Sequence, residues 1–243
     1  MSTVRHVQRG EVYAGALAQL GGEEVEVAGP AALVALTRGE AWVLARDSDA
    51  ALLAVEEGFV LISTDTDPGN GSGRPLGRRI VVATGQRGML LVPPGPGERL
   101  EALTQSRITI VSADTLRVLL RLPLVAEAIL DAFAEALRER QATIRNCAHV
   151  HHSERVLEKL LQLARTYGRA VPGGVRIDFP LTHQLLADMV GSARETVSLA
   201  LSDLARERFL HRQQHRFVLR IDPHALFSPS GVRTAPARQL LHD

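Results

Sequence analysis

The sequence predicts an α+β protein in three successive parts: a β-rich first half, one long helix and a mixed C-terminal third. Short apolar runs cut by turn residues fill the stretch from Leu33 to Leu119, a spacing typical of antiparallel strands. After Pro123 there is no Gly or Pro up to His152, as a long helix requires. Between Phe179 and Leu204, two helix-favouring runs flank a single glycine, which indicates two short helices joined by a tight turn.

Length and composition exclude several classes of protein. The 243 residues are 45% hydrophobic and 23% charged, which is close to the globular average and unlike a fibrous or disordered chain. No apolar run approaches the roughly 18 residues of a membrane span, and the first ten residues lack the apolar core of a signal peptide. We therefore expect a cytoplasmic protein that does not contact a membrane. Cys147 is the only cysteine, so one chain can form neither an internal disulfide nor a four-cysteine zinc or iron-sulfur site.

Charge divides unevenly along the chain, although the formal net charge is only +1. Residues 1–152 hold 15 Lys and Arg against 18 Asp and Glu, whereas residues 153–243 hold 13 against 9. Eight of the nine histidines lie at or after His149, so mildly acid pH makes the second half more basic still. This asymmetry favours an anionic partner for the C-terminal half.

Residues 1–120 are expected to form the β-rich domain. Its predicted strands are Ala41–Ala45, Ala50–Val55, Phe59–Ser63, Arg79–Thr84, Met89–Val92 and Ile108–Val111. Turn residues separate them, above all Asp67–Gly73 and Pro93–Gly97. Short strands at this spacing indicate an antiparallel β barrel or a cupin-like jelly roll.

Residues 121–152 are expected to form the long helix and a hinge after it, with Pro123 in the first turn of the helix, where its missing N–H is not needed. A stripe of side chains recurs near three- and four-residue intervals: Leu130, Phe133, Leu137, Ile144, Cys147 and His151. Arg140 interrupts this stripe. Because the stripe is narrow and the helix is long, we expect two copies to pack together in a parallel homodimer. The alternative is a helix that lies on its own β domain.

Residues 153–243 are expected to form the third part. Its first helix would extend from Ser153, as N-cap, to Tyr167, and a strand would follow at Val175–Phe179. Thr182 would cap a second helix over His183–Val190, and Gly191 would supply the sharp turn into a third helix.

The helix after the glycine is expected to begin with a capping box made by Ser192 and Glu195. Small Ala187 would let the two helices cross closely. The positions that would be buried around it are Leu186, Val190, Val197 and Ala200, and those that would face outward are Arg194, Glu195, Ser198 and Ser202. At the start of a helix lying in the major groove, Arg can bond guanine and Glu can accept from cytosine.

A basic segment follows the third helix. It contains Arg206, Arg208, Arg212, Arg216 and Arg220. Two strands joined by His211–His215 would form a hairpin, or wing, whose charges suit phosphate contacts, with Arg212 and Arg216 as the DNA-binding candidates. Together these features indicate a winged helix-turn-helix that binds DNA.

These residues resemble a known family. The run VGSARETVSLALSDL and the hairpin after it are similar to the Crp/Fnr superfamily of bacterial transcription regulators. ERVLEKLLQLARTYG looks like the first helix of that family's DNA-binding domain, Leu122–His152 like its dimerisation helix, and RGEAWVLARDSDAALLAVEEGFVLI like the opening of its jelly-roll sensor domain. The resemblance implies a homodimer on a near-palindromic DNA site, with RNA polymerase as a further partner. It also implies that Arg194 and Glu195 read bases, and that phosphates are contacted or oriented by Thr182, His183, Gln184, Ser192 and Thr196.

The chain departs from the family pattern in three places. Leu199 stands where the family often has a second arginine, and Leu185 where many members have glutamate. Members that bind cyclic nucleotides carry a Gly-Glu step followed by Arg-Ser/Thr-Ala, and the corresponding stretch Gly88–Ala102 keeps Arg99 without that context. Because a buried phosphate needs a well-placed cation or helix N-terminus, we do not expect a cyclic nucleotide to bind. The effector stays open.

One cluster near the end of the long helix could bind a metal. Cys147 and His151 would share a helix face at i and i+4, a spacing that can chelate zinc or copper, and a dimer could complete four ligands. A polar hinge, an intersubunit disulfide and haem ligation are the alternatives. The rival function is therefore a metal- or haem-dependent sensor that acts through a protein partner. No catalytic motif of the common hydrolase or nucleotidase types occurs, so we do not expect an enzyme.

Overall fold

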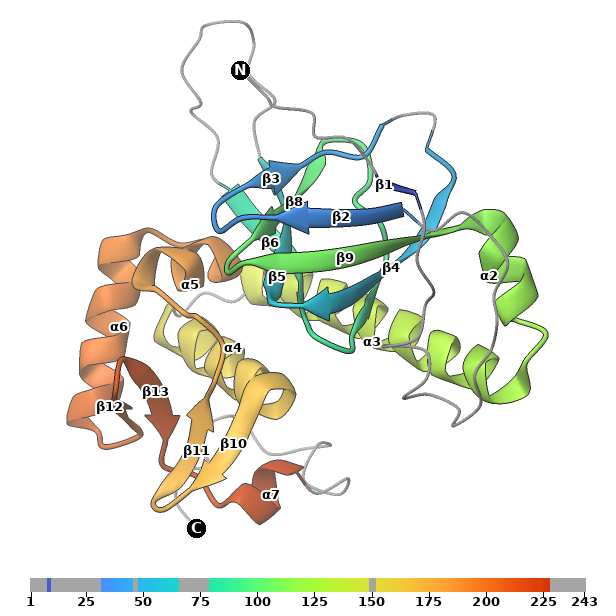
Figure 1. The fold of residues 1–243 in the computed structure, drawn as a ribbon. Helices are drawn as coiled ribbons and strands as arrows, with labels where there is room; N and C mark the ends of the chain where they lie inside the picture. The colour runs from blue at the N-terminus through green and yellow to red at the C-terminus, as the bar shows by residue number, and fades with distance from the viewer. Residues whose placement is uncertain (1–7, 10–31, 46–47, 66–78, 149–151, 228–243) are drawn as a thin grey trace, which may run out of the picture. The chain divides into compact units, whose positions relative to one another are not determined.

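The computed structural model describes residues 8–9, 32–45, 48–65, 79–148 and 152–227 (Figure 1). The chain divides into two compact units, Met1–Gln141 and Ala142–Asp243. The division lies inside the long helix, so a separate helical segment over residues 121–152 stays a prediction. In the described parts of the chain, no helix is both long and apolar enough to cross a membrane.

The first unit is built from two antiparallel sheets. One has the order β1 (Gln8–Arg9), β2 (Ala32–Leu36), β9 (Ser106–Ser112), β4 (Ala50–Glu57) and β7 (Leu90–Leu91), and the other has β3 (Ala41–Trp42), β8 (Glu98–Ala102), β5 (Phe59–Asp65) and β6 (Arg79–Gln86). Each strand bonds antiparallel neighbours. This architecture confirms the antiparallel jelly-roll class that the sequence predicts.

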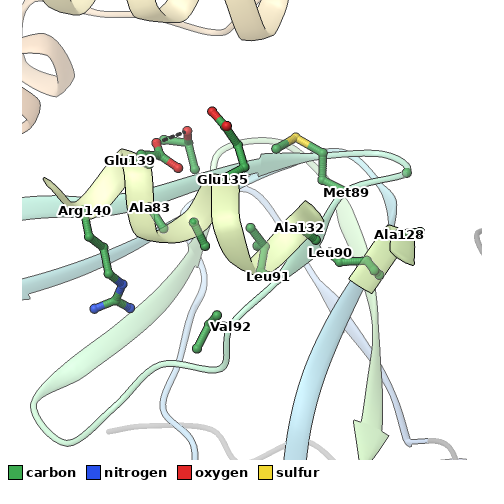
Figure 2. A pocket seen from close by; sticks show the side chains of 13 residues that line it. Ala83, Met89, Leu90, Leu91, Val92, Ala128, Ala132, Glu135, Glu139 and Arg140 are labelled. Atoms are coloured by element: carbon green, nitrogen blue, oxygen red, sulfur yellow. Dashed lines mark hydrogen bonds between the residues drawn. The ribbon is translucent and has the colours of Figure 1, made fainter. Parts of the chain in front are cut away.

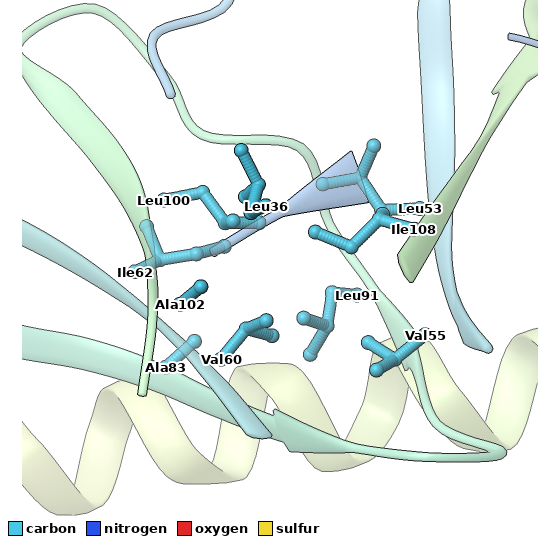
Figure 3. Close-up of a cluster of buried hydrophobic side chains, with 10 residues drawn as sticks. All are labelled: Leu36, Leu53, Val55, Val60, Ile62, Ala83, Leu91, Leu100, Ala102 and Ile108. Atoms are coloured by element: carbon cyan, nitrogen blue, oxygen red, sulfur yellow. The ribbon is translucent and has the colours of Figure 1, made fainter. Parts of the chain in front are cut away.

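The core of the first unit lies between the two sheets (Figure 3). Both sheets contribute to it, through Leu36, Leu53, Val55, Val60, Ile62, Ala83, Leu91, Leu100, Ala102 and Ile108. Successive side chains of a strand point to opposite faces. Leu53 therefore enters this core, whereas its neighbour Leu52 packs on the outer face with Val111 of β9.

Three strands of the first unit were not predicted. β1 and β2 precede the predicted strands, and β8 directly follows the turn Pro93–Gly97. In β8, Leu100 and Ala102 are buried while the charged residues between and before them are partly exposed. The charged residues hide this alternation in the sequence, although it is the period-2 pattern of a half-buried strand.

Two helices follow the sheets. α2 (Ala113–Leu119) is capped by Ser112, whose Oγ accepts from the Thr115 N–H (3.2 Å). α3 (Pro123–Ala148) confirms the long helix. The helix was predicted to extend to about His152; the structure gives α3 as far as Ala148, and His152 is the first residue of the next helix. Val125 and Ile129 of α3 are buried with Leu52 and Val111, and Phe133 packs against them.

The apolar residues of α3 lie on two faces. One face packs on the unit's own sheets, as above, and accounts for Phe133 of the predicted stripe. The other face presents Leu130, Leu137 and Ile144, seven residues apart, with exposed fractions of 64%, 58% and 71%. Arg140 points away from this row, because its guanidinium forms two bonds with the Glu98 carboxylate of β8 (3.0 and 3.3 Å). The interruption in the stripe thus belongs to the face that packs on the sheets.

The second unit is a helical domain with a four-stranded antiparallel sheet. Its elements are α4 (His152–Tyr167), β10 (Gly168–Val171), β11 (Gly174–Ile177), α5 (His183–Val190), α6 (Arg194–Arg206), β12 (Leu210–Gln213), β13 (Arg216–Leu219) and α7 (Pro223–Phe227), and the sheet order is β10-β11-β13-β12. α4 begins one residue before the predicted cap Ser153, which is therefore inside the helix. β10 was not predicted. It pairs with the predicted strand β11 through the turn at Pro172 and Gly173.

Alanine substitutions at two glycines of the first unit test how closely the turn before β5 approaches β9. Gly58 and Gly97 have nearly equal positive φ angles, 86° and 79°, so alanine at either position costs about 1–2 kcal/mol from the backbone alone. A Cβ at Gly58 would lie 2.3 Å from the Gln105 carbonyl oxygen, whereas a Cβ at Gly97 meets nothing within 4 Å. We expect Gly58→Ala to lower the free energy of unfolding clearly more than Gly97→Ala, measured by urea denaturation. Equal losses would contradict the close approach of the turn to β9.

Candidate nucleic-acid interface

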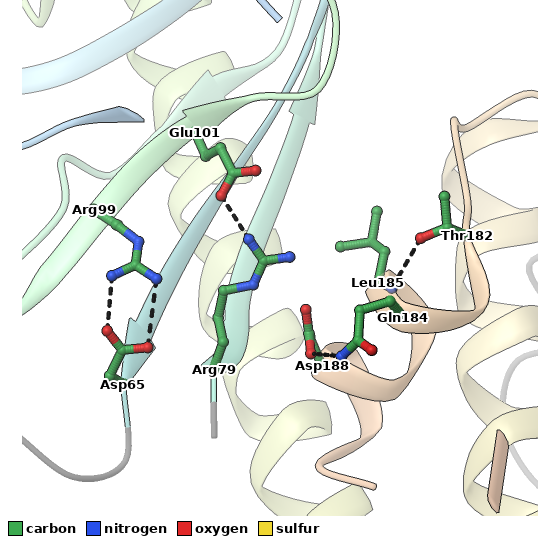
Figure 4. A network of polar contacts seen from close by, with 8 residues as sticks. All are labelled: Asp65, Arg79, Arg99, Glu101, Thr182, Gln184, Leu185 and Asp188. Carbon is green, nitrogen blue, oxygen red and sulfur yellow. Dashed lines mark hydrogen bonds and ion pairs between the residues drawn. The ribbon is translucent and has the colours of Figure 1, made fainter. Parts of the chain in front are cut away.

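The helix-turn-helix is set by two local features that the sequence predicts. Thr182 caps α5, since its Oγ1 accepts from the Leu185 N–H (3.0 Å) (Figure 4). Gly191 ends α5 in the left-handed region, with φ 62° and ψ 38°, a conformation that glycine adopts without steric cost. α6 starts three residues later. Leu185, where the family pattern often has glutamate, is buried and belongs to the apolar core. Thr182 therefore caps α5 without a glutamate partner at position 185.

α5 and α6 pack on α4 through an apolar core. The predicted inward positions are all buried: Leu186, Ala187, Val190, Val197 and Ala200. From α4, the buried residues include Val156, Leu157, Leu160 and Leu161. The side chain of Ala187 is fully buried, and its small size permits the close helix crossing that the motif needs. This packing confirms which face of α6 points inward.

The predicted capping box at the start of α6 is wrong. The N-cap is Ala193, and no side chain caps the helix. Ser192 is instead turned inward and only 6% exposed. Its Oγ accepts from Arg155 (3.1 Å) and lies 3.1 Å from His152 Nδ1. The buried guanidinium of Arg155 requires a hydrogen-bond acceptor. Because the Ser192 hydroxyl accepts from Arg155, it does not cap α6.

The outward face of α6 carries the residues predicted to read bases. Arg194 and Glu195 are exposed and Thr196 is half-buried. Ser198 Oγ donates to the Arg194 carbonyl (2.9 Å) and lies 2.9 Å from His183 Nδ1. Leu199, where relatives often have arginine, is 69% exposed. The start of α6 thus presents one cation, one carboxylate and a large apolar side chain to solvent.

β12 and β13 form the predicted basic hairpin, with a shorter loop than expected. The register pairs Gln213 with Arg216, so only Gln214 and His215 form the turn, and His211 belongs to β12. Both turn residues have positive φ, 48° and 64°, as a two-residue hairpin turn requires. The guanidinium of Arg212 lies 5.0 Å above the ring centre of Phe217, a cation–π distance.

A shallow pocket of about 430 Å³ brings many of the predicted residues together. It is lined by Leu181, Thr182, His183, Gln184, Arg194, Arg212 and His215. Five of these are predicted DNA contacts, drawn from α5, α6 and β12. The lining does not include the other five, which are Ser192, Glu195, Thr196, Ser198 and Arg216. Sequence reasoning missed His215, although it lies in the basic hairpin, and it missed the supporting residues Arg155 and Phe217.

Electrostatics at this pocket are positive. Burial of the ring, and then the charges of Arg212 and Arg194, lower the pKa of His183. The Gln184 amide donates to Asp188 Oδ1 (2.8 Å) and so engages that carboxylate (Figure 4). Arg216 lies near another acid, Asp178, whose pKa is lowered mainly by hydrogen bonding from Arg176. The pocket therefore suits an anion, as a DNA phosphate would require.

The first unit holds a separate cavity between its sheets and α3 (Figure 2). It measures about 230 Å³ and is lined by Ala83, Thr84, Gly88, Met89, Leu90, Leu91, Val92, Ala128, Ala132, Glu135, Ala136, Glu139 and Arg140. Most of these are apolar. Glu135 and Glu139 lie one turn apart on α3, and Thr84 Oγ1 donates to Glu139 (2.9 Å). Glu135 is paired with Arg138 (2.8 Å), so both carboxylates of the lining have a partner.

Arg99, the one residue kept from the cyclic-nucleotide pattern, does not line this cavity. Its guanidinium bonds Asp65 of β5 (2.7 and 3.4 Å), and nearby Arg79 bonds Glu101 (2.6 Å) (Figure 4). The only arginine in the lining, Arg140, is held by Glu98. Among the described residues that line the cavity, the one cation is thus paired with a carboxylate.

The predicted metal ligands cannot be placed. His151 lies outside the described residues, and for Cys147 the structure gives only the helical backbone. In the ranges that are described, no group of three or more His, Cys, Asp and Glu side chains could hold a metal ion. The Cys147–His151 site stays a prediction.

Among known protein families, a match is found for most of the second unit. Residues 154–227 fit the family model of the Crp-like helix-turn-helix domain. The global nitrogen regulator of Synechococcus elongatus is 30% identical over 103 residues, which is 42% of this chain and 46% of that protein. The CRP-like cAMP-activated global transcriptional regulator of Mycobacterium tuberculosis is 31% identical over 119 residues, 47% of this chain and 53% of that one. The chain spans about half the length of these relatives.

Solved structures extend the likeness to both units. A mutant of CooA from Carboxydothermus hydrogenoformans superposes with a TM-score of 0.65 at 18% identity, covering 80% of this chain and 85% of that chain. FixK2 from Bradyrhizobium japonicum superposes with a TM-score of 0.63 at 23% identity, covering 82% and 98%. At these identities the likeness shows the shared fold. Residues 154–227 match the Crp-like helix-turn-helix domain, and the chain as a whole shares the fold of these solved structures.

Proposed function

We propose that the chain is a homodimeric, sequence-specific DNA-binding transcription regulator that works in the cytoplasm and is not gated by a cyclic nucleotide. The observation that carries this proposal is the exposed start of α6 beside the positive pocket. Arg194 and Glu195 face solvent there, while His183, Arg212 and Arg194 line the pocket. Base-reading and phosphate-binding groups thus lie side by side, as a helix in the major groove requires.

The base contacts are assigned to Arg194, Glu195 and Ser198, since an arginine fork matches the O6 and N7 atoms of guanine and a carboxylate accepts from cytosine N4. The phosphate contacts are assigned to the pocket residues and to Arg216 on the wing. Ser192 and Thr196 also stand among the proposed contacts. For Ser192 the inward hydroxyl and the N–H bonded to the Ala187 carbonyl (3.0 Å) favour an orienting role.

Homodimerisation is supported by the exposed row on α3. Leu130, Leu137 and Ile144 repeat at the seven-residue period of a coiled coil. A second copy of α3 would bury this row. Two α6 helices related by a two-fold axis would then meet successive major grooves about 34 Å apart, on a near-palindromic site. RNA polymerase is the further partner that we propose.

The cavity chemistry supports the absence of cyclic-nucleotide gating. A cyclic phosphate is an anion, and burying it without a counter-ion is costly. The arginine in the lining, Arg140, is already held by Glu98, and the lining also contains the carboxylates of Glu135 and Glu139. Arg99 is bonded to Asp65 outside the lining.

Arg194 is the sharpest test of base reading. A duplex selected from a random-sequence pool should bind the wild type far more tightly than a scrambled duplex, with an affinity that falls steeply as salt rises. Arg194→Ala should reduce this preference by about 1–3 kcal/mol, the value of one bidentate base contact, in fluorescence anisotropy titrations. Arg165→Ala, at an exposed position of α4, should behave like the wild type. Unchanged discrimination in Arg194→Ala would remove its base-reading role, and a protein that selects no duplex would favour a protein-docking module.

Leu137 tests the dimer. Leu137→Glu places a charge in the middle of the exposed row, and we expect it to convert a dimer of the 26.3 kDa chain to a monomer in sedimentation velocity, because a buried unpaired carboxylate is costly. Val118→Glu, at an exposed apolar position of α2, should stay dimeric. A wild-type protein that sediments as a monomer, or a Leu137→Glu variant that stays dimeric, would count against this interface.

A further inference from the structure

His183 lies where three elements of the second unit meet. It is the first residue of α5, and its Nδ1 lies 2.9 Å from Ser198 Oγ on α6. Its ring stacks on Phe217 of β13, with ring centres 6.2 Å apart and planes inclined by 29°. The guanidinium of Arg212 of β12 also lies over the Phe217 ring. The ring is thereby held in one place at the edge of the positive pocket that it lines.

The hydrogen bonds around Ser198 decide which ring nitrogen carries the proton. The single hydroxyl hydrogen of Ser198 is donated to the Arg194 carbonyl (2.9 Å). The Ser198 oxygen is then an acceptor, so His183 Nδ1 donates to it and carries the hydrogen of the neutral ring. Nε2 of that neutral ring is a bare acceptor. A phosphate oxygen is also an acceptor only, and the two repel unless Nε2 is protonated.

The charges that face the ring are positive. Arg212 reaches it from β12 and Arg194 from α6, while His215 of the hairpin turn lines the same pocket. The acid on α5, Asp188, accepts from the Gln184 amide. Burial together with the two arginines holds the pKa of His183 below its usual value. In the DNA-free protein these surroundings favour the neutral ring. A phosphate entering the pocket offsets the arginine charges and supplies an acceptor for Nε2.

We propose that His183 takes up a proton when a DNA phosphate enters this pocket and that its Nε2–H then donates to that phosphate. The proton comes from solvent and returns to it when the DNA leaves. The inference rests on the proposed DNA binding and adds to it a dependence on pH. Because the bound form holds more protons, affinity is highest at acid pH. It falls as pH rises above the pKa of the free protein, and it levels off above the pKa of the complex.

The experiment measures DNA affinity against pH with three variants. The probe is the duplex selected from the random pool, and the readout is the Kd from fluorescence anisotropy at fixed salt between pH 6 and 8.5. For the wild type we expect the Kd to rise by up to about tenfold per pH unit for each His183 that binds a proton. His183→Gln should bind more weakly at pH 6 and show a flatter profile. His183→Arg should keep tight binding at pH 8.5, because its donors stay charged. His224→Gln, at an exposed position on α7, is the matched control and should retain the wild-type slope.

Two measurements keep the inference separate from the proposed function. Calorimetry in buffers of different ionisation enthalpy should show proton uptake on DNA binding by the wild type and less by His183→Gln. Nitrogen NMR of the DNA-free protein should show His183 as the Nδ1–H form. Tight DNA binding with equal pH slopes in the wild type and His183→Gln would overturn proton coupling alone, as would an Nε2–H ring. A protein that binds no DNA at any pH would overturn both proposals.

Discussion

The second unit depends on the close crossing of α5 and α6 over α4. Ala187 sits at this crossing without exposed surface, and the residues around it are buried. A larger side chain at Ala187 would force the helices apart, because a packed interior has no spare volume. The angle of α6 fixes which of its residues reach solvent. The exposure of Arg194 and the arrangement of the pocket therefore depend on the apolar packing at Ala187.

The long helix α3 has two apolar faces, one that packs on the first unit and one that is exposed. Its inward side closes the first unit through Val125 and Ile129 and lines the cavity of that unit. Its other side leaves the row of Leu130, Leu137 and Ile144 exposed. The two alternatives drawn from the sequence, a helix on its own β domain and a helix that pairs with a second copy, are thus compatible. A cavity lined by this helix is well placed to connect an event in the first unit with a change in the proposed pairing of two α3 helices.

Local chemistry made part of the fold predictable. Thr182 and Gly191 determine the ends of α5 through their own side chain and backbone, and no distant residue is needed. The capping box failed because the partner of Ser192 is Arg155, 37 residues away in the chain. The two-residue hairpin turn has no glycine at either of its positive-φ positions. The length of this turn therefore has no signal in the sequence. The Thr84–Glu139 bond joins residues 55 apart, and only the folded chain brings these cavity walls together.

The division of α6 into an inward and an outward face has an evolutionary consequence. Val197, Ala200, Leu201 and Leu204 supply its packing, whereas Arg194, Glu195 and Leu199 contribute little to the core. Substitutions at these solvent-facing positions cost little in folding. A gene duplicate could therefore acquire new target sites one residue at a time while its scaffold stays intact. The leucine at position 199, in place of a frequent arginine, is the kind of divergence that this separation permits.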